Sequence, residues 1–308
     1  MLIREAAAQG NAILRNAGID NPGLDSSLIL SFVLKTSRTS LMAAGSESIS
    51  EKDFEAFLAL IEKRRSGFCA AYITGKKEFR GLEFAVNSSV LVPRPDTETL
   101  VEAALKTLNI DLRGLNGLAQ NKKINVLDLC TGSGAVAIAL KHEMPELEVH
   151  ASDICAQALD VAQKNSECLL GIDQINFFIS DLFDVIKSKH STFLIPHSPA
   201  SHSSLVPYSL ITANPPYVRT DEIKTLSAEV QNEPRIALDG GESGLFIIEC
   251  IINEAPQFLI NGGSLLLEAD PRQMEAITIL LKTRRFINIK IYNDLGGSQR
   301  VIGGKFEK

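Results

Sequence analysis

The spacing of apolar residues divides the chain into a helical first part and a longer second part. Over residues 1–67, apolar side chains recur at about the helical period of 3.6 residues, and an Asn-Pro-Gly sequence at 21–23 interrupts that pattern. Ser50, with Asp53 three residues later, is typical of a capping box at the start of a further helix. Residues 1–70 are therefore predicted to form a small N-terminal helical domain.

The pattern changes between residues 71 and 95. Apolar residues mix there with Gly75, Gly81 and Asn87, which indicates a β-hairpin. Two prolines then stand at the threshold of another helix, in the position where the first helical turn accepts proline. We interpret 71–95 as a β-hairpin connector and 96–308 as the main domain.

From residue 124 onward, short β-branched runs alternate with helical patterns. This alternation predicts an α/β fold, in which helices cover both faces of a mostly parallel sheet. The expected helices lie at 134–143, 155–169, 245–260 and 271–283. The seven expected strands lie at 124–129, 148–152, 175–179, 209–213, 263–269, 286–292 and 300–305.

One stretch, 187–206, breaks this alternation. It is rich in serine and predicts a mobile surface insertion. It also carries His190, His197 and His202, which no carboxylate or cysteine accompanies at a metal-ligand spacing, so we expect no metal site.

Composition narrows the class of protein. The 308 residues are 45% hydrophobic and 22% charged, and the net charge of -6 argues against direct binding of nucleic acid.

Five cysteines lie far apart without a C-x-x-C pair, which favours a reduced, cytoplasmic protein without disulfides. We find no signal-peptide pattern and no apolar run of the roughly 18 residues that a membrane span needs. A monomer is expected, since no self-complementary apolar stripe is present.

The turn formed by Asn214, Pro215, Pro216 and Tyr217 carries the most functional information. Proline cannot donate a ladder hydrogen bond, so the strand at 209–213 must end there. The turn presents one side-chain amide, one main-chain carbonyl and one aromatic ring. Such a set suits a planar group that bears NH2, either a carboxamide or the amine of a base. The competing interpretation of these four residues is an ordinary strand-to-loop turn.

A glycine-containing loop follows the first parallel strand. Gly132 and Gly134 allow a tight turn and a close approach by a ligand, and the next helix begins directly behind them with free N–H groups. The loop predicts a ligand of the nucleotide type. Its residues are Cys130, Thr131, Gly132, Ser133 and Gly134.

Acidic residues end the next two strands. Asp153, about twenty positions after the loop, is placed to accept hydrogen bonds from ribose hydroxyls. Asp181 could accept an adenine amino group, with Leu182 packed on the ring. Capping of the following helix is the competing interpretation for both aspartates. All these positions, with Asn214, fall at the carboxyl ends of strands, where open α/β sheets bind ligands.

The sequence of the glycine-containing loop also helps to distinguish between cofactors. A dinucleotide site needs G-x-G-x-x-G, and Ala137 occupies the third glycine position, which the looser form of the motif tolerates. The chain has no Tyr-x-x-x-Lys or similar apparatus for hydride transfer. A methyl donor of the S-adenosylmethionine type therefore fits better.

With these residues assembled, the chain resembles the HemK/PrmC-type N(5)-glutamine methyltransferases over nearly its full length. N-P-P-Y alone is shared with adenine amino-methyltransferases, whereas the P-R-P-D-T-E segment together with E-P-R-I-A-L is specific. The sequence departs from the family pattern at Cys69, Asp96, Cys130, Leu182 and Asp270. The matching motifs lie at 21–25, 71–75, 92–98, 126–134, 214–217, 232–241 and 294–301.

The resemblance implies a fold, a cofactor and a substrate. The fold would be the Rossmann-like S-adenosylmethionine-dependent methyltransferase fold, with S-adenosyl-L-methionine held by residues 130–134, Asp153, Asp181, Leu182 and Asn214. The acceptor would be the glutamine of the Gly-Gly-Gln motif in class I peptide-chain release factors. Asn214, Pro215 and Tyr217 would be catalytic and, with Pro216, would bind the substrate, while the helical domain would grip the release factor.

Three alternatives remain open. A ribosomal-protein glutamine methyltransferase would share the core and differ only in substrate. A DNA adenine methyltransferase would flip its base into the same acceptors, but this acidic chain lacks the basic target-recognition segment that such an enzyme needs. A nucleotide-binding module without catalysis is disfavoured by the presence of both Asn214 and Tyr217.

Overall fold

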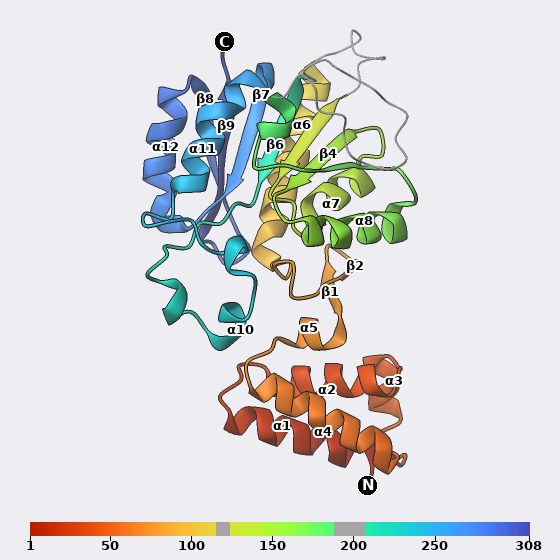
Figure 1. Cartoon of the computed structure of the whole chain (residues 1–308). Coiled ribbons are helices and arrows are strands. Elements are labelled where there is room, and N and C mark those ends of the chain that lie inside the picture. Colours follow the sequence, from red (N-terminus) through yellow and green to blue (C-terminus); the bar gives the residue numbers. More distant parts are fainter. Residues whose placement is uncertain (115–123, 188–206) are drawn as a thin grey trace. The chain divides into compact units, whose positions relative to one another are not determined.

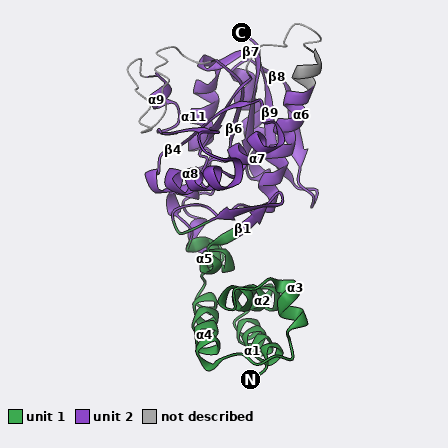
Figure 2. Ribbon diagram, turned by 90° about the vertical axis from the view of Figure 1, so that its right-hand side faces the viewer, with its two compact units in different colours: residues 1–76, 86–88, 226–232 green, residues 77–85, 89–225, 233–308 purple. Residues whose placement is uncertain are grey.

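The computed structural model describes residues 1–114, 124–187 and 207–308, which form two compact units (Figure 2). Unit 1 contains residues 1–76, 86–88 and 226–232, and unit 2 contains 77–85, 89–225 and 233–308. Of the insertion predicted at 187–206, only Lys187 is among the described residues. His190, His197 and His202 all lie outside them.

Unit 1 is helical, as expected. The Asn-Pro-Gly sequence begins the second helix, with Pro22 in its first turn, and Ser50 caps the fourth by accepting a hydrogen bond of 3.1 Å from the Asp53 N–H. Leu14, Ile29 and Phe57 are fully buried between these helices. The helices are α1 (Ile3–Asn16), α2 (Pro22–Val33), α3 (Arg38–Ala43), α4 (Glu51–Arg65) and α5 (Ala70–Thr74).

A buried ion-pair cluster joins distant segments within unit 1. Arg64, only 3% exposed, donates from Nε to Asp25 Oδ2 at 2.7 Å and from Nη2 to Glu229. Glu229 belongs to α10 (Ala228–Gln231). Asp25 is the last residue of the N-P-G-L-D motif, so this motif has a structural role in holding α2, α4 and α10 together.

The range predicted as connector, 71–95, contains more than a β-hairpin. Strands β1 (Lys76–Phe79) and β2 (Leu82–Ala85) form a hairpin, but the expected range of 71–95 also includes most of helix α5, which ends at Gly75 with a φ of 73°. Five residues are too few to show a helical period in the sequence. At the other end, η1 (Pro95–Thr97) is a 3-10 turn that leads into α6 (Glu98–Gly114).

Unit 2 is built on a seven-stranded sheet in the order β5-β4-β3-β6-β7-β9-β8 (Figure 1). All seven predicted strands are present, and β9 runs in the direction opposite to that of the other six. The strands are β3 (Asn125–Leu129), β4 (Glu148–Asp153), β5 (Asn176–Ile179), β6 (Tyr208–Ala213), β7 (Leu259–Glu268), β8 (Phe286–Asn293) and β9 (Gln299–Phe306).

Helices cover both faces of the sheet. Alternate strand residues such as Val126 and Leu210 pack with α6 (Glu98–Gly114), α7 (Ala135–Glu143) and α8 (Ala156–Leu170). Their neighbours Leu127 and Ile211 pack on the other face with two helices. These are α11 (Phe246–Glu254) and α12 (Met274–Thr283).

One predicted helix is too long. The range 245–260 was expected to be a single helix, but α11 ends at Glu254, a 3-10 turn (Ala255–Gln257) follows, and β7 already begins at Leu259. Pro256 ends the helical hydrogen bonding, and residues 260–262 of the strand are exposed, so this part of β7 lacks the apolar pattern of a buried strand.

Over the described ranges, no helix combines the length and the apolar character that crossing a membrane requires.

The ion-pair cluster leads to a stability prediction. Arg64→Ala leaves Asp25 buried without its cation, so we expect the free energy of opening of α2 and α4 to fall by about 3 kcal/mol. Hydrogen exchange of the amides of these helices in the full chain measures that loss directly.

The neighbouring residue is a matched control. Arg65 is exposed, and among the described residues it pairs only with the exposed Glu62 on the same helix, so Arg65→Ala should leave the exchange rates nearly unchanged. Removing both Arg64 and Asp25 should cost less than the sum of the two single changes. Strict additivity would contradict a coupled buried pair.

Candidate active site

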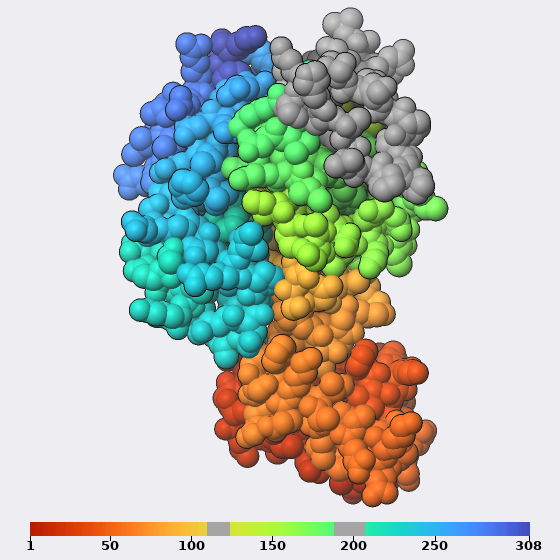
Figure 3. Space-filling view, viewed as in Figure 1, coloured from red at the N-terminus to blue at the C-terminus, as the bar shows by residue number. Residues whose placement is uncertain are grey.

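A cavity of about 520 Å³ opens at the carboxyl ends of β3, β4, β5 and β6 in unit 2. This volume is within the range of small-molecule sites. In the space-filling view, the green surface of residues around 150–185 borders the light-blue surface of residues around 240–260 (Figure 3). The lining residues come from the segments 89–97, 128–136, 152–158, 180–182, 214–216 and 235–247.

The structure brings most of the predicted site residues to this cavity. Gly134, Pro215 and Tyr217 are the exceptions and do not line it. Gly134 is the N-cap residue of α7 with a φ of 82°, and a Cβ there would be 3.2 Å from Ala162 Cβ on α8, so the left-handed backbone and the close approach of α8 favour glycine. The predicted residues on the cavity wall are Cys130, Thr131, Gly132, Ser133, Asp153, Asp181, Leu182, Asn214 and Pro216.

The carboxylate of Asp153 holds the loop. Its Oδ2 accepts the Gly132 N–H at 2.9 Å and its Oδ1 accepts the Cys155 N–H at 2.9 Å. Cys155, not Asp153, is the N-cap residue of α8, so Asp153 does not itself cap the helix. Burial raises the pKa of Asp153, and the two main-chain N–H groups oppose that rise. The carboxylate therefore joins the loop after β3 to the end of β4 while it also faces the cavity.

Asp181 differs from Asp153. Its side chain is exposed, and within the described part of the chain it makes no hydrogen bond. Only its main-chain carbonyl accepts, at 3.0 Å from the N–H of Asp184, at the start of α9 (Asp184–Lys187). The Asp181 carboxylate is thus available to a ligand in the cavity.

Two residues of the wall have backbone angles that favour glycine. Cys130 has a φ of 54° and Leu182 a φ of 44°. A left-handed non-glycine residue costs on the order of 1–3 kcal/mol, and such strain is concentrated at binding sites. Burial raises the pKa of the Cys130 thiol, so this cysteine is held as a neutral thiol.

The sequence analysis missed the role of Asp128. This carboxyl lies on β3 at 1% exposure and accepts from Thr131 Oγ1 at 2.7 Å and from Thr212 Oγ1 at 2.8 Å. Burial raises the pKa of Asp128 to about 6, although the hydrogen bonds from Thr131 and Thr212 lower it. In the sequence, the signal for this role was a charged residue inside an otherwise apolar strand. Ser152 Oγ is also buried at the wall, without a partner among the described residues.

The N-P-P-Y turn is held from behind by hydrogen bonds. Asn214 Nδ2 donates to Thr97 Oγ1 at 3.2 Å, which leaves Oδ1 as the acceptor of that side chain. The Tyr217 hydroxyl donates to Glu268 Oε1 at 3.3 Å, and the Tyr217 carbonyl accepts from Gln273 Nε2 at 3.1 Å. Burial raises the pKa of Tyr217, so its hydroxyl stays protonated. Pro215 is buried, and none of the described residues donates to its carbonyl.

The segment at 233–241 packs against the turn and against residues 92–94. Gly240 packs so closely that a Cβ would be 2.8 Å from the Pro216 carbonyl oxygen, and its N–H donates to the Val218 carbonyl at 2.8 Å. The buried carboxylate of Glu233 accepts from Arg94 and, at 3.3 Å, from the Val92 N–H. The two motifs that are specific to the family resemblance therefore bind each other next to the cavity.

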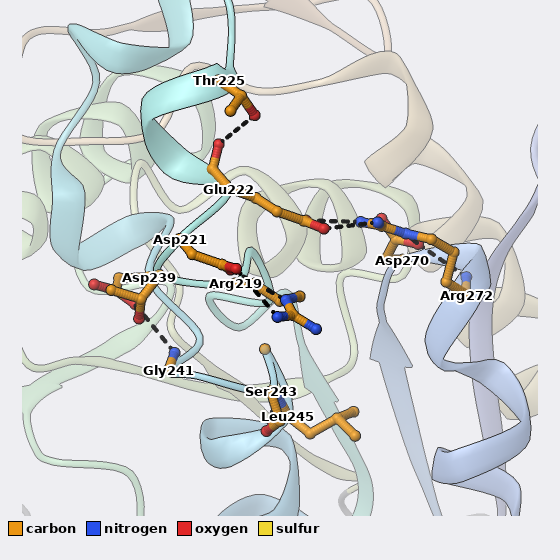
Figure 4. Close-up of polar contacts among 12 residues, drawn as sticks. Arg219, Asp221, Glu222, Thr225, Asp239, Gly241, Ser243, Leu245, Asp270 and Arg272 are labelled. Carbon is orange, nitrogen blue, oxygen red and sulfur yellow. Dashed lines mark hydrogen bonds and ion pairs between the residues drawn. The ribbon is translucent and has the colours of Figure 1, made fainter.

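Ion pairs stabilise the loops that follow the turn (Figure 4). Asp239 accepts from the Thr220 hydroxyl and, at 3.1 Å, from the Gly241 N–H. Arg272 bridges Glu222 and Asp270, each at 2.9 Å. Asp270, one of the departures from the family pattern, has its pKa lowered by the hydrogen bond from Arg272. This departure thus provides an ion pair outside the cavity wall.

Within the described ranges, no three acidic, histidine or cysteine side chains form a cluster that could hold a metal ion.

Comparisons with known proteins agree with this geometry. The model of the PrmC N-terminal domain matches residues 5–75, and that of the methyltransferase small domain matches 115–213. The crystal structure of the hMettl16 catalytic domain in complex with the MAT2A 3'UTR hairpin 1 is 14% identical. It covers 86% of this chain and 84% of its own, with a TM-score of 0.53, so the likeness concerns the fold alone.

Relatives of known name cover almost the whole chain. The release factor glutamine methyltransferase of Buchnera aphidicola is 34% identical over 96% of this chain and 97% of its own length. That of Deinococcus radiodurans is 32% identical over 98% of both. The glycine loop that Asp153 binds and the N-P-P-Y turn lie at one cavity, at the edge of the seven-stranded sheet. Because relatives of 34% and 32% identity cover nearly the whole chain, this chain belongs to the release factor glutamine methyltransferase family.

Proposed function

We propose that this protein transfers a methyl group from S-adenosyl-L-methionine to the side-chain amide nitrogen of the glutamine in the Gly-Gly-Gln motif of class I peptide-chain release factors. The observation that carries the proposal is that Asn214 lines the same cavity as the loop residues 130–133 and Asp153. A planar amide and a nucleoside cofactor can therefore meet in one site, in a chain of this family.

The residues of the cavity fit such a cofactor. Gly132 has a φ of 56° with nothing within 4 Å of the position of a Cβ, which leaves room for a close approach to the main chain. We assign cofactor binding to residues 130–134, Asp153, Asp181, Leu182 and Asn214, with Asp153 facing ribose hydroxyls and Asp181 the adenine amine. When bound, S-adenosylmethionine supplies the methyl group, activated on a sulfonium.

The turn would orient the substrate. An amide nitrogen is a poor nucleophile because its lone pair is delocalised into the carbonyl. In our proposal, Asn214 Oδ1 and the Pro215 carbonyl accept the two N–H bonds of the glutamine carboxamide and favour the charge that develops on nitrogen. Pro216 and the ring of Tyr217 pack on the amide plane and exclude water. The nitrogen loses its proton once it is alkylated, so positioning carries the catalysis.

Other parts of the proposal concern the whole protein. We assign release-factor binding to the helical domain at 1–70, with 71–95 as connector and 96–308 as the catalytic domain. The large surface of the partner supplies binding energy that free glutamine lacks. We further propose a cytoplasmic monomer that binds no nucleic acid directly, in line with the net charge of -6.

The substrate can be tested against the alternatives in one assay. Purified release factors, ribosomal proteins and adenine-containing DNA are incubated side by side with labelled cofactor, and only the release factor should gain label. Mass spectrometry should place about 14 Da, the mass of one CH2, on the glutamine of its Gly-Gly-Gln motif. Label on a ribosomal protein or on DNA instead would overturn the proposal.

Removal of Asn214 tests the role of the turn. Asn214→Ala removes the side-chain acceptor, and we expect kcat to fall by at least about 100-fold, as for other groups that stabilise developing charge. Asn214 is only one of the residues assigned to the cofactor, so calorimetry should show a rise in the cofactor dissociation constant much smaller than the fall in kcat. Turnover equal to that of the unchanged protein would contradict this role.

Removal of Asp153 tests the cofactor site. Asp153→Ala frees the Gly132 and Cys155 N–H groups and takes away the expected ribose acceptor, so the cofactor dissociation constant should rise by about 10- to 100-fold, or about 1.4–2.8 kcal/mol. Asp160→Ala, at an exposed position on α8, is the matched control and should bind normally. Equal affinities of the two variants would argue against the assignment.

A further inference from the structure

A buried side-chain amide lies next to the end of the N-P-P-Y turn. Gln273 is the last residue of the 3-10 turn η5 (Pro271–Gln273), which follows β7, and it is only 8% exposed. Its Nε2 donates to the Tyr217 carbonyl at 3.1 Å and to the Gly244 carbonyl at 3.1 Å. Its Oε1 accepts from the Asp270 N–H at 3.1 Å. Gln273 does not line the cavity and has no part in the methyl transfer as derived above.

The three partners leave this amide a single orientation. Each partner is a main-chain group, and a main-chain N–H can only donate while a carbonyl can only accept. The side-chain oxygen of Gln273 must therefore face Asp270, and its NH2 must face the two carbonyls. Because the amide is buried, a movement of any of the three segments would leave one of its polar atoms without a partner.

The loop that contains Gly244 is shaped for this contact. Gly244 has a φ of 72°, and a Cβ there would lie 2.5 Å from the Tyr217 carbonyl oxygen and 2.7 Å from Gln273 Nε2. Glycine therefore allows the loop before α11 to approach both groups closely. Asp239 and Ile247, on either side of Gly244 in the sequence, line the cavity. Gln273 thus joins the turn to a second part of the cavity wall.

The two ends of the N-P-P-Y turn are held by different groups. At the first end, Ala213 pairs with both neighbouring strands of the sheet. At the second end, the Tyr217 carbonyl accepts from Gln273. Pro215 and Pro216 lie between these ends, and their rings fix the φ angle of both residues. With so little rotational freedom in between, the position of Tyr217 determines the direction of the Pro215 carbonyl.

We propose that Gln273 is a positioning residue, whose amide fixes the end of the N-P-P-Y turn so that Asn214 and the Pro215 carbonyl point at the substrate amide. This inference rests on the proposed function. Gln273 touches neither reactant and acts only through the main chain of the turn. A displacement of about 1 Å in an orienting group is enough to lower a rate about 100-fold.

Gln273→Glu tests the proposal, because glutamate has the same shape and can still accept from Asp270. Its carboxylate cannot donate and would face the carbonyl oxygens of Tyr217 and Gly244. We therefore expect kcat to fall on the order of 10- to 100-fold. The KM for the release factor and the dissociation constant of the cofactor should change little.

Gln174→Glu is the matched control. Gln174 Nε2 also donates to a main-chain carbonyl, that of Ile172 at 3.2 Å, but it lies at an exposed position just before β5. The control variant loses the same kind of hydrogen bond away from the turn, so it should keep the kcat of the unchanged protein.

Gln273→Met separates the loss of the hydrogen bonds from the effect of the added charge. Methionine has a similar length but no NH2 group, and kcat should fall by the same order as in Gln273→Glu. Thermal unfolding and the stoichiometry of cofactor binding report how much of each variant is folded. A residue that only stabilises the fold would lower the melting temperature and leave the kcat of the folded enzyme unchanged. A folded Gln273→Met enzyme with full activity would overturn the proposal.

Hydrogen exchange in the free protein separates this inference from the proposed function. The Val218 N–H donates to the Leu238 carbonyl at 2.9 Å, and the Gly240 N–H donates to the Val218 carbonyl at 2.8 Å. Both bonds require the turn and the loop to stay together, so these two amides should exchange faster in Gln273→Glu, whereas the Ile211 amide within β6 should not. Unchanged exchange at Val218 and Gly240 would refute the positioning role. Failure of the unchanged protein to methylate release factors would refute the proposed function instead.

Discussion

The parallel pairing of β3 with β4 and β6 determines where the candidate site residues at the ends of these three strands lie. Leu129 is in register with Ser152 on one side and with Ala213 on the other. The next residue of each strand is Cys130, Asp153 or Asn214, so the glycine loop, the acidic strand end and the N-P-P-Y turn all begin at one level of the sheet. A shift of one residue in either pairing would turn these side chains to the opposite face. The cofactor side and the amide side of the site therefore depend on one shared register.

Buried carboxylates give the edge of the sheet its rigidity. Asp128, Asp153, Glu233 and Glu268 come from different segments, and each accepts hydrogen bonds from a segment distant in the sequence. A buried carboxylate is costly unless it is hydrogen-bonded, so each of these groups strongly favours the arrangement that satisfies it. Burial nevertheless raises the pKa to about 6 for Asp128 and to about 7 for Glu268. Two of the four groups that hold the site therefore titrate close to physiological pH.

The two left-handed residues on the cavity wall show how the loops are bent toward the cavity. Cys130 and Leu182 follow closely after the ends of β3 and β5, where the chain must turn sharply. Glycine would adopt the backbone angle found at position 130 without strain. Cysteine there keeps the turn, at an energetic cost that the surrounding hydrogen bonds of Thr131 and Gly132 offset.

The sequence by itself determined the class of the fold, because apolar periodicity reports burial directly. It predicted all seven strands of the sheet and the helical first domain, and most of the loop, aspartate and N-P-P-Y residues that it selected line one cavity. It failed for helix α5 and for the first part of β7, where the segment is too short or too exposed to show a period. Only the tertiary structure decided which polar groups support the site. Thr97 lies 117 positions from Asn214 and Glu268 lies 51 from Tyr217. Hydrogen bonds over such separations leave no periodic trace, because they depend on the folded sheet bringing the ends of distant segments together.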